Sequence, residues 1–218
     1  MITIGIVDND RFALALIAQT VGRAVPGGQV LWSVESGAGA LHHCLYGGDA
    51  CPDVLLLDVS LTDMDGLTVC RRIRESSARP AVLCITSYDV GHYRGAAIEA
   101  GAQGLVSKSC RPKDLASAIR TVAEGRAVNV DFMDASVAHE HVAAEAVTRS
   151  RTVLSERERQ VLDGYARNLD TEEIARRLGI RASTVFVVVR HAKVKLGVST
   201  RAEAVRAYLA ARRADSVH

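Results

Sequence analysis

The sequence contains no long hydrophobic run. No apolar stretch approaches the roughly 18 residues that are needed to cross a bilayer, and the first acidic side chain already occurs at Asp8. We therefore expect a cytoplasmic protein that has no membrane partner. The hydrophobic share of 48% and the charged share of 24% are typical of a globular protein.

Cysteine spacings that indicate metal or redox chemistry are also missing. The five cysteines are odd in number, and no two of them form a Cys-x-x-Cys pair. This pattern favours reduced, mostly buried thiols over a zinc site or a disulfide framework. The sequence shows no nucleotide-binding loop and no nucleophile–base arrangement, so we do not expect an enzyme that acts on an external substrate.

The charges that are present are distributed unevenly. Residues 1–150 hold 13 Lys and Arg against 17 Asp and Glu, a net charge of −4. Residues 151–218 hold 14 against 8, a net charge of +6, and the two values add up to the +2 of the whole chain. An acidic part therefore precedes a basic part, and the basic part is a candidate for binding nucleic acid.

Short apolar runs alternate with amphipathic segments over residues 1–125, which we predict to form the first domain. Several runs are too uniformly apolar to have one face in water, which indicates an α/β fold with a parallel sheet covered by helices on both sides. Residues 126–150 lack a strong apolar period and are predicted to be a partly helical linker. The five expected strands are residues 2–7, 29–34, 53–58, 81–86 and 104–108.

Only short helices are predicted in the second domain, residues 151–218. Ser155 and Asp170 each begin a helix with capping-box spacing, and Gly179 ends the second of these helices. The next stretch, STVFVVVRHAKVKLG at 183–197, is ambiguous, because Val and Phe favour a strand. Apolar residues nevertheless recur there at helical spacing, at Val185, Val189, Ala192 and Leu196.

Polar side chains follow the predicted strands of the first domain. Because the carboxyl ends of parallel strands meet at one edge of a sheet, we expect these side chains to converge. Neighbouring carboxylates repel each other unless a hard cation such as Mg²⁺ neutralises them, and a hydroxyl and an ammonium opposite them suit a phosphoryl group. The residues are Asp8, Asn9 and Asp10 after the first strand, Asp58 after the third, Thr86 after the fourth and Lys108 after the fifth.

In the order and spacing of these residues, the segment 1–125 resembles the receiver domain of two-component response regulators. The resemblance implies a doubly wound five-stranded sheet of order 2-1-3-4-5 and phosphorylation by a sensor histidine kinase. It implies that Asp58, in VLLLDVSLTDMDG, is the phosphoacceptor, that Thr86 contacts the phosphate and that Lys108 pairs with it. Gly66 matches the turn glycine that follows the acceptor loop. The implied Mg²⁺ ligands are Asp8, Asn9, Asp58 and the carbonyl of Ser60.

Four positions, Asn9, Thr62, Ser87 and Leu105, depart from the receiver pattern, and two of them bear on the metal and on activation. Asn9 stands where receivers usually carry a second acid, so the affinity for Mg²⁺ should be lower. Leu105 stands where an aromatic ring usually rotates inward on activation. We expect the receiver to be controlled by phosphorylation, with a phosphorylation-independent atypical regulator as the alternative.

Residues 154 to about 210 resemble the LuxR-type helix-turn-helix of the NarL/FixJ subfamily. The match rests on LSERERQVL, EEIARRLGI, STV and KLGVSTRAEAV. It implies four helices, the third in the major groove of promoter DNA and the fourth supporting dimer contacts, so we expect a homodimer. In this context the stretch 183–197 is predicted to be a recognition helix, with Ser183 as a substitute cap.

The recognition helix also departs from its family. Phe186 and Val188 occupy positions that usually carry Lys and His. Together with Val187 they could instead form an apolar surface that binds protein, which gives the alternative of an interaction module that has lost DNA binding. We predict a DNA-binding transcriptional regulator whose DNA contacts are Arg181, Ser183, Thr184, Phe186, Val187, Arg190, Lys193, Lys195 and Arg201.

Overall fold

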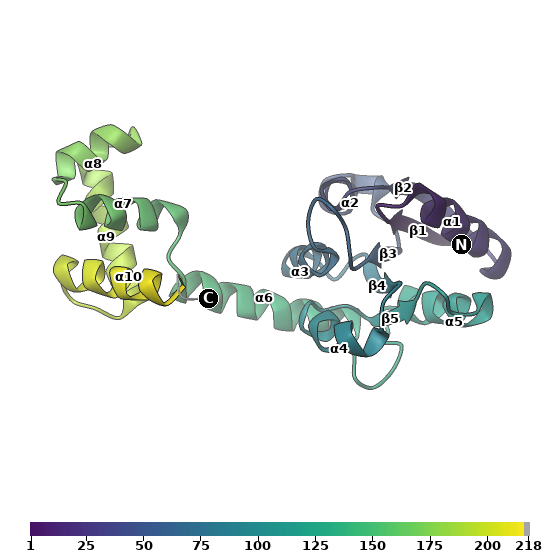
Figure 1. The fold of residues 1–218 in the computed structure, drawn as a ribbon. Helices are drawn as coiled ribbons and strands as arrows, with labels where there is room; N and C mark the ends of the chain where they lie inside the picture. The colour runs from purple at the N-terminus through teal and green to yellow at the C-terminus, as the bar shows by residue number, and fades with distance from the viewer. Residues whose placement is uncertain (216–218) are drawn as a thin grey trace. The chain divides into compact units, whose positions relative to one another are not determined.

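Five parallel strands form one sheet in the order β2-β1-β3-β4-β5 (Figure 1). This is the predicted doubly wound sheet, and each predicted strand agrees with the observed one to within a residue at either end. The central strands β3 and β4 are buried along their whole length. The strands are β1 (Ile2–Val7), β2 (Gly28–Val34), β3 (Val54–Asp58), β4 (Ala81–Thr86) and β5 (Gly104–Ser107).

The computed structural model describes residues 1–215, with side chains for all of these except 149–152 and 213–215. The last three residues of the predicted second domain lie outside the described residues. The chain divides into two compact units between Glu145 and Ala146. Within residues 1–215, no helix is long and apolar enough to cross a membrane.

Helices cover both faces of the sheet, as the uniformly apolar strands predict. One hydrophobic cluster lies between the sheet and α1 and α5, and a second lies between the sheet and α2, α3 and α4. A short 3₁₀ turn, Gly48–Ala50, precedes β3. The helices are α1 (Arg11–Ala24), α2 (Gly37–Leu45), α3 (Gly66–Ser76), α4 (Val90–Glu99) and α5 (Pro112–Ala123).

Much of the segment that the sequence predicts to be a linker packs with the first unit. Helix α6 (Ala135–Thr152) begins inside this unit, and Phe132, Ala138 and Val142 are buried. The His139 Nδ1 atom lies 2.6 Å from the carbonyl oxygen of Arg74. The first compact unit therefore extends to Glu145, whereas the limits of the functional domains stay a prediction.

All five cysteines are free thiols, and Cys44, Cys70 and Cys84 are buried. Burial raises the pKa of the Cys44 thiol to about 12. Cys110, which is nearest in sequence to Lys108, is half-buried, and burial again raises the pKa of its thiol. Since the thiolate is the nucleophilic form, the thiols of Cys44 and Cys110 have little reactivity near neutral pH.

The second unit contains α7 (Glu156–Ala166), α8 (Thr171–Leu178), α9 (Ala182–Leu196) and α10 (Arg201–Asp215). The predicted capping boxes are present at Ser155 and Asp170. Gly179 ends α8 with a φ of +63°, a left-handed conformation that favours glycine.

The ambiguous stretch of valines is a helix, which confirms the expected secondary structure. Val185, Val189 and Ala192 are buried against the other helices, and Leu196 is half-buried at the end of the same stripe. Burial of this stripe outweighs the local preference of Val for a strand. Ser183 does not cap the helix as expected, because α9 begins at Ala182 and Arg181 occupies the cap position without a side-chain hydrogen bond.

Candidate functional site

The register of the sheet brings the predicted acidic residues together. Val7 pairs with Leu57 across β1 and β3, so Asp8 and Asp58 follow on neighbouring strands. The side chains of both residues are buried. The end of β4 places the buried Thr86 beside the same edge of the sheet, because Asp58 pairs with the residue before it.

Lys108 links the two carboxylates. Its Nζ atom lies 2.7 Å from Asp8 Oδ2 and 3.0 Å from Asp58 Oδ2. Burial of the ammonium lowers the pKa of Lys108, but pairing with Asp8 and Asp58 outweighs burial, so the pKa lies above its usual value. One positive charge therefore compensates two buried carboxyl groups, which leaves the site acidic.

The carboxylate of Asp8 has capacity for a further ligand. Asp8 Oδ1 accepts a hydrogen bond of 3.0 Å from the backbone N–H of Asp10. Asp8 Oδ2 is buried, and its contact with Lys108 is an ion pair without hydrogen-bond geometry. Mg²⁺ binds through one or two carboxylates and retains several waters, so Asp8 and Asp58 together fit this ion. No group of three Asp, Glu, His or Cys side chains placed to hold a metal occurs among the described residues.

The other two predicted metal ligands flank the carboxylates. Asn9 is exposed in the loop between β1 and α1, and Ser60 is half-buried in the loop after β3. Asp10, the remaining acid of this loop, accepts a hydrogen bond of 2.8 Å from the N–H of Phe12 and caps α1. Asp10 therefore has a structural role that does not depend on a metal.

Gly66 lets helix α3 approach the carbonyl end of β3. A Cβ atom at this position would lie 2.0 Å from the carbonyl oxygen of Asp58 and 2.9 Å from the Cα atom of Val59. Any side chain would therefore displace the backbone at Asp58. This steric conflict explains why position 66, which matches the turn glycine of receivers, is occupied by glycine.

Thr86 is connected to both neighbouring segments. Its Oγ1 atom accepts a hydrogen bond of 3.0 Å from the N–H of Tyr88, and its carbonyl oxygen accepts one of 2.8 Å from the N–H of Lys108. Leu105, at the usual aromatic position, is buried in the cluster under α2, α3 and α4, against which Tyr93 also packs. A shift of Thr86 would therefore change its hydrogen bonds with the backbone N–H groups of Tyr88 and Lys108.

Helix α9 presents a second surface, on the side opposite its buried stripe. Phe186 is 61% exposed and Val187 is 44% exposed, and Arg190 is exposed one turn further along. Val188, by contrast, packs partly against the core of the unit. The exposed large apolar side chains of α9 are therefore Phe186 and Val187 near its start and Val194, 75% exposed, two turns beyond Val187.

Two of the cations predicted to contact DNA, Lys193 and Lys195, already have partners within the protein. The Lys195 Nζ atom lies 2.9 Å from Glu158 Oε2, and both side chains are largely buried. Burial raises the pKa of Glu158, but hydrogen bonds from Ser155 and the Lys195 contact outweigh it and lower the pKa. Lys193 donates a hydrogen bond of 2.9 Å to the carbonyl oxygen of Ser199. This geometry favours structural roles for both lysines.

The remaining predicted contacts lie at the surface. Arg181, Ser183 and Thr184 are exposed around the start of α9. Arg201 is exposed at the start of α10, and its guanidinium carbon lies 4.6 Å from the centre of the Tyr165 ring.

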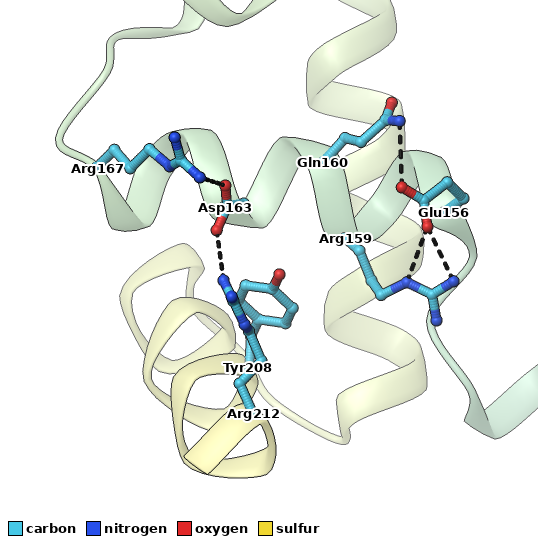
Figure 2. A pocket seen from close by; sticks show the side chains of 7 residues that line it. All are labelled: Glu156, Arg159, Gln160, Asp163, Arg167, Tyr208 and Arg212. Atoms are coloured by element: carbon cyan, nitrogen blue, oxygen red, sulfur yellow. Dashed lines mark hydrogen bonds and ion pairs between the residues drawn. The ribbon is translucent and has the colours of Figure 1, made fainter. Parts of the chain in front are cut away.

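A pocket of about 370 Å³ between α7 and α10 was not predicted from the sequence (Figure 2). Figure 2 shows Asp163 between two arginines. Its Oδ2 atom lies 2.8 Å from Arg167 Nη2, and its Oδ1 atom lies 2.7 Å from Arg212 Nη1. The residues of this pocket thus pair with one another, and none of them is a predicted DNA contact. The pairing joins α10 to α7, which is a structural role.

Two family models match the chain. The response regulator receiver domain matches residues 4–120, and the luxR family of bacterial regulatory proteins matches residues 152–208. The transcriptional regulatory protein UhpA of Escherichia coli K12 is 30% identical over 206 residues, which cover 94% of this chain and 97% of UhpA. The nitrate/nitrite response regulator protein NarL of the same strain is 33% identical over 154 residues, 70% of this chain and 71% of NarL.

A solved structure is similar to nearly the whole chain. The crystal structure of the response regulator ChrA, from a heme-sensing two-component system, has a TM-score of 0.50 at 25% identity and covers 97% of this chain and 98% of ChrA. An α/β unit with an acidic pocket, followed by a basic helical unit, defines a DNA-binding transcriptional regulator. The chain belongs to the response regulators of the NarL/FixJ subfamily, which join a receiver domain to a LuxR-type DNA-binding domain.

Replacing Lys108 by Met should destabilise the first unit in a pH-dependent manner. Asp8 and Asp58 then remain buried without a counter-ion, which is costly. In the native protein the raised pKa of Lys108 keeps its contribution complete below about pH 10, and the contribution is lost as the pH rises further.

Urea unfolding followed by tryptophan fluorescence measures this effect, because Trp32 is the single tryptophan and lies in the first unit. The exposed Lys113 provides a matched control, Lys113→Met, that should unfold like the native protein. A Lys108→Met variant that unfolds at the same urea concentration as the native protein at pH 7 would contradict the assigned electrostatic role.

Proposed function

We propose that the receiver of this DNA-binding regulator accepts a phosphoryl group on Asp58 from a sensor histidine kinase. The observation that carries the proposal is the position of the Lys108 ammonium, which lies between Asp58 and Asp8 at the carboxyl ends of the strands. The Asp58 carboxylate attacks the phosphorus atom, and the donor histidine leaves. Lys108 and the hydroxyl of Thr86 then bind the new phosphoryl oxygens.

Mg²⁺ is the cofactor of the proposed transfer. Asp8 and Asp58 would hold it, together with the carbonyl of Ser60 and the amide oxygen of Asn9. When bound, the ion neutralises charge on the phosphoryl oxygens. Lys108 provides a positive charge for the phosphoryl oxygens whether or not the ion is bound.

The phosphoryl group acts on the surroundings of Thr86. A dianion on Asp58 attracts the Thr86 hydroxyl, which currently accepts the hydrogen bond from the N–H of Tyr88. Rearrangement of that bond changes the loop that leads into α4, and we propose that this change controls dimerisation or DNA binding. A phosphorylation-independent regulator is the second candidate, favoured by Asn9 and by the absence of an aromatic ring at Leu105.

Incubating the protein with Mg²⁺ and acetyl phosphate should produce one phosphoryl adduct, visible in the intact mass. Asp58→Asn should show no adduct. Asn9→Asp should react faster, because a third carboxylate strengthens Mg²⁺ binding.

Asp10→Asn is the matched control for these variants. It removes an acid next to the pocket, yet asparagine still caps α1, so the adduct should form as in the native protein. An adduct that persists in Asp58→Asn would place the acceptor elsewhere. A native protein and an Asn9→Asp variant that both fail to react would favour the phosphorylation-independent regulator.

For the second unit we propose that a homodimer binds promoter DNA through α9. Phe186, Val187 and Arg190 would face the bases, while Arg181 and Arg201 would contact phosphates. Ser183 and Thr184, exposed at the start of the helix, would donate hydrogen bonds to phosphates. We propose residues 1–125 as the receiver, 126–150 as the connecting segment and 151–218 as the DNA-binding domain.

Replacing Arg190 by Ala should weaken binding to a selected DNA duplex by about 1–3 kcal/mol, since an arginine that reads guanine contributes this much. Fluorescence anisotropy with labelled duplex measures the loss. Arg206→Ala removes the same charge from an exposed site on α10 and should have a much smaller effect.

The salt dependence of binding separates this proposal from the protein-interaction module. Phosphate contacts make the affinity fall steeply as salt increases, whereas apolar association does not weaken. A native protein that binds no duplex, with or without phosphorylation, would contradict DNA binding through α9.

A further inference from the structure

The exposed apolar side chains of α9 are not required by the core of the second unit. Phe186 belongs to neither hydrophobic cluster that the described residues of this unit form. It precedes the exposed Val187 on the same helix, and we call the exposed side chains of these two residues the apolar patch. Adjacent exposed apolar side chains on one helix indicate a binding surface more strongly than a single one does.

The charges around this patch indicate that its ligand is a polyanion. Arg181 is exposed just before the helix, and Arg190 is exposed on it. Residues 151–218 carry the net charge of +6, and the luxR-family match covers this region. The ligand of the patch must therefore offer an apolar group within an anionic surface.

The major groove of DNA offers such a group. A phenyl ring has no hydrogen-bond donor or acceptor, so Phe186 cannot bind a phosphate or a polar base edge. The apolar group at the base edges of the major groove is the C5 methyl of thymine. This methyl group is the chemical partner that matches Phe186.

The helix sets the distance between the two base contacts. Phe186 and Arg190 are four residues apart, which corresponds to about 6 Å along a helix at 1.5 Å per residue. Bases in one strand are about 3.4 Å apart. The base that Phe186 contacts is therefore about two steps from the one that Arg190 contacts.

We propose that Phe186 is a specificity-determining residue that contacts the C5 methyl group of a pyrimidine, about two base pairs from the Arg190 contact. The inference rests on the proposed DNA binding by α9. Phe186 replaces the lysine that is usual in the family, so a contact with a phosphate or a purine is exchanged for a contact with a methyl group. Val187 extends the same apolar surface.

Replacing thymine by deoxyuridine tests this proposal directly, because the change removes the methyl group and leaves base pairing intact. A preferred duplex is first selected from random DNA with the full-length protein, and each thymine is then replaced singly. At one or two positions the affinity should fall about fourfold, which corresponds to about 0.8 kcal/mol for one buried methyl group. Phe186→Ala should bind the thymine and uracil duplexes equally.

Matched variants test whether the Phe186 ring causes the loss of affinity for uracil duplexes. Val153→Ala truncates an exposed apolar side chain elsewhere in the unit and should keep the fourfold penalty for uracil. Phe186→Lys should bind DNA without distinguishing thymine from uracil. Since Phe186 is exposed, circular dichroism should show folded protein for each variant.

Two results would overturn the inference and leave the proposed function intact: native binding that is insensitive to every uracil, or a uracil penalty that persists in Phe186→Ala. Failure of the native protein to bind any duplex is a distinguishable result, because it contradicts DNA binding by α9 itself and removes the basis of the methyl contact.

Discussion

Lys108 holds together the site on which the first unit depends. Two carboxylates at the ends of neighbouring strands would repel each other in a buried position, and the ammonium within 2.7 Å of Asp8 and 3.0 Å of Asp58 makes their burial tolerable. The same arrangement leaves a net negative charge that fits a divalent cation, and it places a positive charge where phosphoryl oxygens would lie. The structural ion pair and the proposed phosphoryl site therefore consist of the same three residues, Asp8, Asp58 and Lys108.

Local sequence patterns were sufficient to predict the sheet and the convergence of its polar ends. The strands are short, apolar and bounded by turns, and parallel pairing then brings their carboxyl ends to one edge. Helix α9 shows that residue propensity alone can mislead, because valine favours a strand. The helical spacing of Val185, Val189, Ala192 and Leu196 is what indicates a helix. The packing of residues 126–145 was not predicted, since the alanines around Phe132 and Val142 give a weak apolar pattern.

Contacts between distant residues explain the other differences. Lys195 is a predicted DNA contact, and no local sequence pattern indicated that its ammonium pairs with Glu158, 37 positions away. Ser183 was expected to cap α9, but the helix begins at Ala182 and Arg181 occupies the cap position, two residues earlier. Local sequence patterns also could not predict the pairing of Asp163 with Arg212, because the two residues are 49 positions apart. Family resemblance predicted the roles of residues, whereas only the folded chain indicates which cations are already paired.

Coupling between the two units is the central claim, and DNA affinity with and without a phosphoryl mimic tests it most directly. Fluorescence anisotropy with a selected duplex compares the protein in Mg²⁺ alone with the protein in Mg²⁺ and beryllofluoride, which mimics a phosphoryl group on Asp58. The account predicts an affinity that rises at least fivefold, about 1 kcal/mol of coupling, and no change in Asp58→Asn. Equal affinities for the native protein in both conditions would contradict it.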